Sequence, residues 1–281
     1  MEKLKIGDFN TLEVARATDF GVYLAYEGGD VLLPKRYVTD EMTEGTEVEV
    51  FIYHDSEGRL VPVQETPLAK VGDFAALQVK DVAEFGAFLD MGLIKDLFVP
   101  TKEQHRPMKV GAIHVVKVML DPQTERLMGV ARIGAFLRKD TPDFEAGQAV
   151  ELLVYEITDL GYMCLIDSEY AGMLYKNEVY RDITIGSKFT GYIKKVREDD
   201  KIDLSERPLG FEGLEGQELM IMEKLQQAKG GFLPFNDKSA PDAIRDTFEM
   251  SKKSFKKLIG VLYKQRLIEI TEKGIRMMGQ E

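Results

Sequence analysis

Two aromatic side chains three residues apart, followed by a basic segment, are the residues of this sequence best suited to bind a nucleic acid. Phe85 and Phe88 stand in the stretch Phe85-Gly86-Ala87-Phe88-Leu89, and the connection after it carries Lys102, Arg106 and Lys109. An aromatic ring exposed on a strand stacks on any base, because every base has a π face, and cationic side chains hold the phosphates. The pattern predicts a site for a single strand. The alternative is that these rings pack inside a domain or between domains, where aromatic residues bury much area.

A second candidate surface is the segment from Ser251 to Arg266, which carries six Lys and Arg residues and no Asp or Glu. Helical spacing places apolar residues on one face and basic residues on the other. The apolar residues are Phe255, Leu258, Ile259 and Leu262, and the basic ones are Lys252, Lys253, Lys256, Lys257 and Lys264, with Gly260 among them. Lys in place of Arg favours phosphate contacts over base readout, which Arg performs better. The alternative is an ordinary solvated helix face.

Catalytic chemistry has little support in this sequence. The three histidines are His54, His105 and His114, and the one cysteine is Cys164. The sequence has no Cys-His cluster, no His-Glu-x-x-His and no Gly-rich phosphate loop. His105 and His114 supply too few ligands for a metal ion. We therefore expect no enzymatic activity, no metal and no cofactor.

The first aromatic stretch belongs to an internal repeat. A near copy is Phe20-Gly21-Val22-Tyr23-Leu24, and a divergent copy is Leu160-Gly161-Tyr162-Met163-Cys164. Gly7, Gly72 and Gly147 each precede the first residue of a copy by 13 positions. A constant offset predicts three copies of one structural unit. Phe20 and Tyr23 are therefore further candidates for base stacking, whereas the third copy has lost both aromatic residues.

Each copy reads as short strands separated by Gly and Asp turns, which is typical of a small antiparallel barrel. We expect barrels at residues 1–66, 67–140 and 141–210. Residues 211–281 read as three helices followed by a hairpin, the order of a winged helix-turn-helix. Ser239-Ala240-Pro241-Asp242 predicts a capping box with an early Pro at the start of the second of these helices.

The net charge of −11 is unevenly distributed. Residues 1–66 contain 6 basic residues (Lys and Arg) and 14 acidic ones (Asp and Glu), and residues 141–210 contain 8 basic and 14 acidic residues. Residues 67–140 contain 11 basic and 9 acidic residues, and residues 211–281 contain 12 basic and 11 acidic residues. Because attraction to phosphates dominates nucleic-acid binding, the second and fourth segments are the candidates. The acidic segments support another hypothesis, a protein-interaction scaffold with little or no nucleic-acid binding. DNA binding through the last segment alone is a weaker third.

Composition places the chain among ordinary globular proteins, with 30% charged and 44% hydrophobic residues. No apolar run approaches the ~18 residues of a membrane helix. The start of the sequence lacks the apolar core of a secretory signal. A single cysteine excludes an intrachain disulfide and fits a reducing compartment. We expect a cytoplasmic protein without membrane contact.

Several motifs carry a resemblance to a known family. The Gly-Asp starts at Gly7 and Gly72, the Phe-Gly-Ala-Phe-Leu stretch and the closing Ile202-Asp203-Leu204-Ser205 resemble the S1 RNA-binding domain, a five-stranded OB-fold barrel. Three such units followed by a winged helix resemble the bacterial conserved virulence factor B family. The resemblance implies a multidomain, mainly β fold with an α+β winged-helix domain at its end. It also implies RNA binding with a regulatory role in transcript fate or translation.

The resemblance also implies which residues would contact RNA. In S1 domains, the two aromatics of this stretch, a following aromatic or His, and nearby basic residues form the RNA face. Carried over, these are Phe85 and Phe88 in the second unit and Phe20 and Tyr23 in the first. The position of the following aromatic or His, which is the third position of the motif, falls on Leu33, Val99 and Tyr175. The His is therefore absent from all three copies. We therefore expect single-stranded RNA to bind the second barrel and the basic helix.

Overall fold

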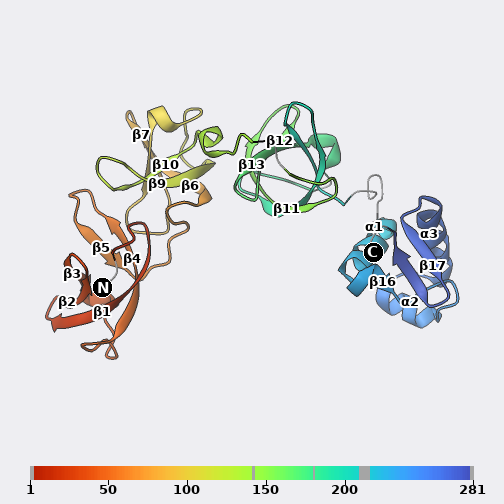
Figure 1. Cartoon of the computed structure of the whole chain (residues 1–281), viewed down its shortest axis with the longest axis horizontal. Helices are drawn as coiled ribbons and strands as arrows, with labels where there is room; N and C mark the ends of the chain where they lie inside the picture. Colours follow the sequence, from red (N-terminus) through yellow and green to blue (C-terminus); the bar gives the residue numbers. More distant parts are fainter. Residues whose placement is uncertain (1–2, 141–142, 180, 209–215, 279–281) are drawn as a thin grey trace.

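The computed structural model describes residues 3–140, 143–179, 181–208 and 216–278. Three five-stranded barrels follow one another along the chain, and a winged-helix domain comes last, so the expected mainly β fold is confirmed (Figure 1). Residues 141 and 211, where two domain boundaries were expected, lie outside the described residues.

The barrels share one strand order. Barrel 1 contains β1 (Asp8–Thr18), β2 (Gly21–Tyr26), β3 (Gly29–Pro34), β4 (Glu47–His54) and β5 (Leu60–Val63). Barrel 2 contains β6 (Phe74–Ala83), β7 (Gly86–Leu89), β8 (Leu97–Pro100), β9 (Ile113–Leu120) and β10 (Leu127–Val130). Barrel 3 contains β11 (Ala149–Ile157), β12 (Gly161–Ile166), β13 (Tyr170–Tyr175), β14 (Lys188–Val196) and β15 (Ile202–Ser205). Barrels 2 and 3 close by parallel pairing of their third and fifth strands, and in barrel 1 the corresponding β3 and β5 lie side by side.

The first strand of each barrel carries a bulge at the same place. Its pairing with the second strand shifts between Val14 and Arg16, between Val79 and Asp81, and between Val154 and Glu156. A bulge bends a strand and increases its twist, which lets one long strand follow the curve of a small barrel. The three bulges show that the sequence repeat is a repeat of backbone geometry.

Barrels 1 and 2 share a hydrophobic core. Phe51 and Tyr53 of β4 and Val63 of β5 are buried in one cluster with the core of barrel 2. Phe51 is fully buried and packs edge-on against Phe9, with ring centroids 5.5 Å apart. At the same junction, the Val71 amide donates to the Gly7 carbonyl oxygen at 2.9 Å. The two barrels therefore stabilise each other.

A smaller apolar contact joins barrels 2 and 3. Phe74 and Val115 of barrel 2 are buried in one cluster with Leu153 and Leu165 of barrel 3. Ile133, in the short 3-10 turn Ile133–Phe136 that follows barrel 2, completes it. Phe74 and Val115 cover the outside of one barrel where it meets the next.

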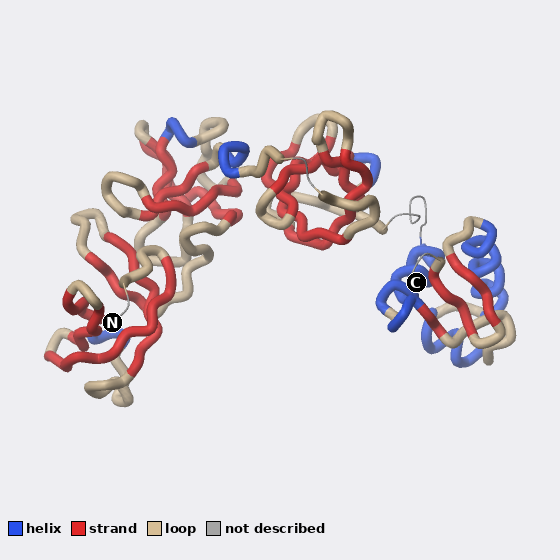
Figure 2. Tube along the Cα trace, viewed as in Figure 1, coloured by secondary structure: helices blue, strands red, loops and turns tan. Residues whose placement is uncertain are grey.

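The last domain packs three helices on a small sheet (Figure 2). Its elements are α1 (Gly216–Gln227), β16 (Phe232–Leu233), α2 (Pro241–Phe248), α3 (Lys252–Lys264), β17 (Ile268–Thr271) and β18 (Gly274–Met277). Phe248 of α2 and Phe255 of α3 are fully buried, with ring centroids 4.8 Å apart. The two-residue strand β16, which pairs with β18, was not predicted.

The predicted capping box before α2 is wrong. Ala240 is the residue at the N-cap, and no side chain caps this helix. The Ser239 hydroxyl instead accepts a hydrogen bond from the backbone N–H of Asn236 at 2.9 Å. Asn236 is buried and its side chain donates to the carbonyl oxygens of Thr271 and Glu272. Ser239 is therefore used to order the loop around Asn236, while Pro241 begins the helix as predicted.

No helix in the described ranges is long and apolar enough to cross a membrane.

The shared core makes barrel 1 and barrel 2 interdependent. We expect Phe51→Ala to lower the free energy of unfolding by about 3–5 kcal/mol, because a fully buried ring is removed. Hydrogen exchange measured on the same variant should show lost protection in both barrels. The matched control is Phe20→Ala, whose ring is 78% exposed; it should change stability by no more than about 0.5 kcal/mol. Loss of protection in barrel 1 alone would contradict a shared core.

Candidate nucleic-acid interface

Three phenylalanine rings form a cluster on the surface of barrel 2. Phe88 of β7 lies directly opposite Phe98 of β8, and Phe85 comes just before β7. The ring centroids are 6.1 Å apart for Phe85 and Phe88, 5.7 Å for Phe85 and Phe98, and 5.4 Å for Phe88 and Phe98. Phe85 is 63% exposed, and the other two rings are half-buried. This Phe85–Phe88–Phe98 cluster presents aromatic surface to solvent while its inner edges are packed.

The glycine of the motif permits this packing. A Cβ on Gly86 would lie 2.5 Å from the Val99 carbonyl oxygen and would overlap the Phe98 ring. In the other barrels, a Cβ on Gly21 or Gly161 would overlap the carbonyl oxygen of Leu33 or Leu174. The glycine therefore serves the close approach of the second and third strands. Because that need is independent of binding, the third copy of the motif keeps its glycine without its aromatics.

A repeated hydrogen bond places a polar turn beside the first residue of each motif. The Thr101 amide donates to the Phe85 carbonyl oxygen at 3.0 Å. The Lys35 and Lys176 amides donate in the same way to Phe20 and Leu160, at 2.9 and 3.2 Å. In barrel 2, the exposed Lys102 directly follows Thr101, the residue whose amide is bonded to Phe85.

The other two basic residues predicted for this site lie elsewhere along the connection. The Arg106 guanidinium forms an ion pair with the Glu156 carboxylate of barrel 3, at the junction of the two barrels. Lys109 is exposed in the loop before β9. Of the three predicted basic residues, Lys102 thus follows the residue bonded to Phe85, whereas Arg106 is paired with a neighbouring barrel.

The third ring, Phe98, was missed from the sequence because the third position of the motif was assigned incorrectly. Leu33 and Val99 are fully buried, and each lies opposite the residue that follows the motif glycine of its barrel. Tyr175 instead lies opposite Gly161, which is the motif glycine of barrel 3. These three residues are therefore not equivalent. Strand alternation in Leu97-Phe98-Val99-Pro100, with Leu97 and Val99 buried, is the signal that would have placed Phe98 outside.

Barrel 1 has a smaller aromatic surface. Phe20 is strongly exposed, but the Arg16 guanidinium lies 3.9 Å from the centroid of the Tyr23 ring and covers one face of it. Arg16 also pairs with Asp30. Beside Phe88, the position equivalent to Arg16 is held by Asp81.

Barrel 3 uses the corresponding surface differently. Its motif presents Leu160, which is 68% exposed, and Met163. Glu156, the cross-strand partner of Met163, is the residue that binds Arg106 of barrel 2. The surface that carries aromatics in barrel 2 is therefore partly occupied by a neighbouring barrel in barrel 3.

The basic face of α3 is exposed as predicted from its helical spacing. Ser251 caps the helix, because its hydroxyl accepts a hydrogen bond from the backbone N–H of Ser254 at 3.1 Å. Phe255, Ile259 and Leu262 are buried on the opposite, apolar face of the helix. Lys253, Lys256, Lys257 and Lys264 are exposed, and Lys252 is half-buried. Lys256 lies 3.5 Å from Asp237. A Cβ on Gly260 would meet no atom within 4 Å, so the centre of the face is open.

Tyr263, which was not predicted from the sequence as a site residue, is 55% exposed at the border of these lysines.

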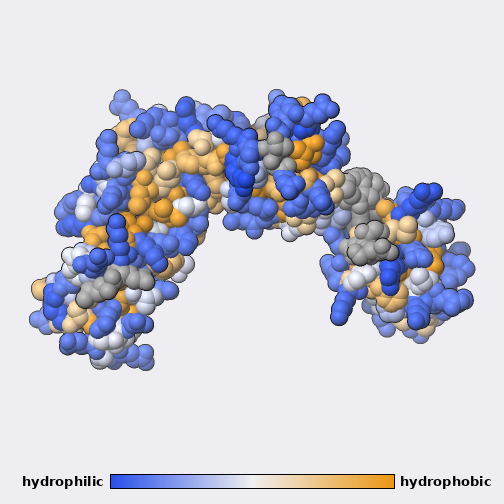
Figure 3. Space-filling model, viewed as in Figure 1, coloured by the Kyte–Doolittle hydropathy of each residue, from blue (hydrophilic) through white to orange (hydrophobic). Residues whose placement is uncertain are grey.

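Hydrophilic side chains cover much of the molecular surface in Figure 3, with apolar patches between them. Within the described residues, no group of three or more His, Cys, Asp or Glu side chains is placed to hold a metal ion.

Comparison with known proteins agrees with this arrangement. An S1 domain model matches residues 6–64, and a CvfB-like winged helix domain model matches residues 219–277. The chain is 28% identical to the uncharacterized protein YitL of Bacillus subtilis, over 94% of this chain and 90% of that protein. It is 29% identical to conserved virulence factor B of Staphylococcus aureus, over 82% of this chain and 79% of that protein.

A solved structure covers almost the same length. It is the crystal structure of a multidomain protein with nucleic acid binding domains from Streptococcus pneumoniae. It covers 97% of this chain and 98% of its own, at 25% sequence identity and a TM-score of 0.46.

The packing at Gly86 leads to a test of the close approach of β7 and β8. We expect Gly86→Ala to destabilise the protein by about 1–3 kcal/mol, because the added methyl group overpacks against β8. Gly134→Ala is the control, since a Cβ there meets nothing within 4 Å; it should be close to neutral. Thermal or urea unfolding measures both. Equal stabilities of the two variants would show that the close approach of β7 and β8 is not required.

Proposed function

Because the chain is a CvfB-like protein, homologous to conserved virulence factor B over 82% of its length, we propose that it binds single-stranded RNA and regulates transcript fate or translation without catalysing a reaction. The RNA would contact the Phe85–Phe88–Phe98 cluster of barrel 2 through its bases. Its phosphates would contact Lys102 and the basic face of α3.

The observation that carries this proposal is the exposed aromatic cluster itself. Aromatic rings on an OB-type barrel bind single strands by stacking, and each stacked base contributes on the order of 1–3 kcal/mol. Three adjacent rings, one of them 63% exposed, offer room for such stacking. The ring-to-ring packing also holds the cluster in place before RNA arrives, which lowers the entropy lost on binding.

The lysines of α3 supply a second, electrostatic contact. The third helix of a winged helix commonly enters a groove of a nucleic acid. Here that helix presents lysines, which favour phosphate over base contacts, around an open Gly260. This supports affinity with little sequence preference, and a lysine surface can hold the phosphates of a single strand as well as those of a duplex.

A protein-interaction scaffold is the second candidate. Residues 1–66 and 141–210 are acidic, with 14 Asp and Glu residues in each, and barrel 3 has no aromatic pair at its motif. A protein partner that binds the purified chain equally well after nuclease treatment, together with no RNA binding at low salt, would favour the scaffold. Tighter binding of duplex DNA than of single-stranded RNA would favour a DNA-binding regulator.

The stacking assignment is tested by shortening the rings. We expect Phe85→Ala and Phe98→Ala each to weaken binding of a short single-stranded RNA by about 5- to 150-fold, the equivalent of one lost stacking contact. Fluorescence anisotropy with a labelled oligonucleotide measures it. Leu160→Ala, at the equivalent position of barrel 3, is the matched control and should have no effect. If Phe85→Ala and Phe98→Ala both bind like the parent, the cluster is not the stacking site.

The electrostatic contact has its own signature. The logarithm of affinity for a single strand falls with the logarithm of salt concentration by about 0.7 for each phosphate contact. Replacing Lys253, Lys257 and Lys264 together by Gln should therefore reduce that slope by about 2. Lys201→Gln, which alters a lysine paired with Asp199 on barrel 3, should leave it unchanged. An unchanged slope in the triple variant would remove α3 from the RNA-binding surface.

A further inference from the structure

Gly260 leaves a gap in the middle of the basic face of α3. Apart from its own helix backbone and its chain neighbours, a Cβ at this position would meet no atom within 4 Å. A glycine inside a helix is destabilising relative to alanine, because its backbone loses more freedom on folding. Among the described residues, none comes close enough to require a glycine here. The gap is therefore open to a group that approaches from outside the protein.

Four exposed side chains surround this gap. On a helix surface, the neighbours of a residue are those three and four positions away. For Gly260 they are Lys256, Lys257, Tyr263 and Lys264, all of them exposed. Side chains on a helix lean toward its N-terminus, so Tyr263 leans toward the turn that contains Gly260. Its ring borders the gap without filling it.

The Tyr263 side chain has no partner in the part of the chain that the structure describes. Its ring is 55% exposed and contacts no other aromatic ring or cation there, and its hydroxyl forms no hydrogen bond. A single exposed aromatic residue is common on protein surfaces. What distinguishes Tyr263 is its place beside an open gap and among lysines, which is the combination that binds a base and its phosphates.

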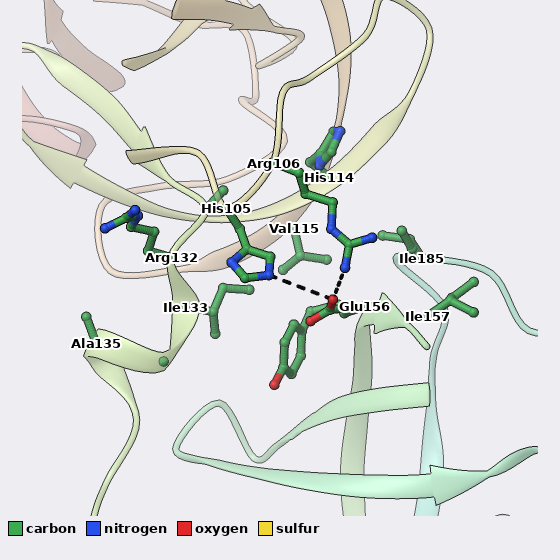
Figure 4. A pocket seen from close by; sticks show the side chains of 13 residues that line it. His105, Arg106, His114, Val115, Arg132, Ile133, Ala135, Glu156, Ile157 and Ile185 are labelled. Carbon is green, nitrogen blue, oxygen red and sulfur yellow. Dashed lines mark hydrogen bonds and ion pairs between the residues drawn. The ribbon is translucent and has the colours of Figure 1, made fainter. Parts of the chain in front are cut away.

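The lysines beside the gap are available for phosphates. Lys257 and Lys264 form no ion pair with any described residue. Lys256 lies 3.5 Å from an exposed carboxylate, a contact that contributes little stability. Arg106 shows the contrast, because its guanidinium is already paired with Glu156 at the junction of barrels 2 and 3 (Figure 4).

We propose that an unpaired nucleotide of a single strand places its base in this gap and stacks it on the Tyr263 ring, while the flanking phosphates contact Lys257 and Lys264. The inference rests on the proposed function, in which α3 contacts phosphates, and gives the same helix a base contact as well. A base that is paired and stacked inside a duplex cannot enter the gap. The lysines hold either form of nucleic acid, so Tyr263 and Gly260 make α3 selective for a single strand.

Two substitutions remove the site without changing the charge of α3. Tyr263→Ala deletes the ring, and Gly260→Gln fills the gap with a side chain of good helix propensity. Each should weaken binding of a short single-stranded RNA to the intact protein by about 5- to 150-fold, the equivalent of one stacking contact, as measured by fluorescence anisotropy. Tyr263→Phe keeps the ring and is the matched control, which should bind within about twofold of the parent. Gly260→Gln should unfold at a temperature no lower than that of the parent, because glycine is the poorer helix former.

A strand of the same length with abasic sites in place of its nucleosides separates stacking from phosphate contact. It keeps the phosphates and lacks the bases, so Tyr263→Ala should leave its binding at low salt unchanged. If Tyr263→Ala weakens the abasic and the complete strand by the same factor, the ring does not contact a base and the proposal is overturned.

The variants also separate this inference from the proposed function. If Phe85→Ala weakens RNA binding while Tyr263→Ala and Gly260→Gln bind like the parent, the base site on α3 is wrong and the RNA face of barrel 2 stands. If the parent binds no single-stranded RNA at low salt, both are wrong.

Discussion

The carbonyl oxygen of Val99 in β8 comes so close to Gly86 in β7 that no side chain fits between them. This close approach fixes which residues of the two strands lie opposite each other. It pairs Phe88 with Phe98 on the outer side and leaves Leu97 and Val99 inside the barrel. The hydrogen bond from Thr101 to the Phe85 carbonyl then holds the third ring at the end of the cluster. The proposed RNA face therefore follows from a backbone contact that the barrel needs for its own packing.

The same contact occurs in all three barrels, yet their outer surfaces have diverged. The residue after the bulge of the first strand is Arg16 in barrel 1, Asp81 in barrel 2 and Glu156 in barrel 3. Arg16 covers Tyr23, and Glu156 binds Arg106 of the preceding barrel. Among the three described barrels, only barrel 2 has an aromatic ring opposite this residue with no guanidinium over it: Phe88, which lies opposite Asp81. One repeated scaffold thus supports an aromatic surface, a cation-covered surface and an inter-barrel contact.

Much of the fold could be predicted from the sequence because its signals are local. Gly and Asp turns, strand alternation and the 13-residue offset predicted the barrels, and helical spacing predicted the buried and exposed faces of α3. The site was predicted in part. Phe98 was missed because its neighbour Val99 was taken for the third position, a shift of one residue that exchanges the two faces of a strand. The pairing of Arg106 with Glu156, 50 residues away, depends on how two barrels pack. Local sequence carries no signal for such a contact.

We propose that barrel 2 and α3 form the RNA-binding surface while the other two barrels contribute little. This can be measured by ultraviolet crosslinking of single-stranded RNA to the intact protein, followed by mass spectrometry of the attached peptides. Crosslinked peptides should contain residues 85–102 of barrel 2 and residues of α3. Crosslinks confined to barrel 1 or barrel 3, or no crosslinks at low salt, would contradict it.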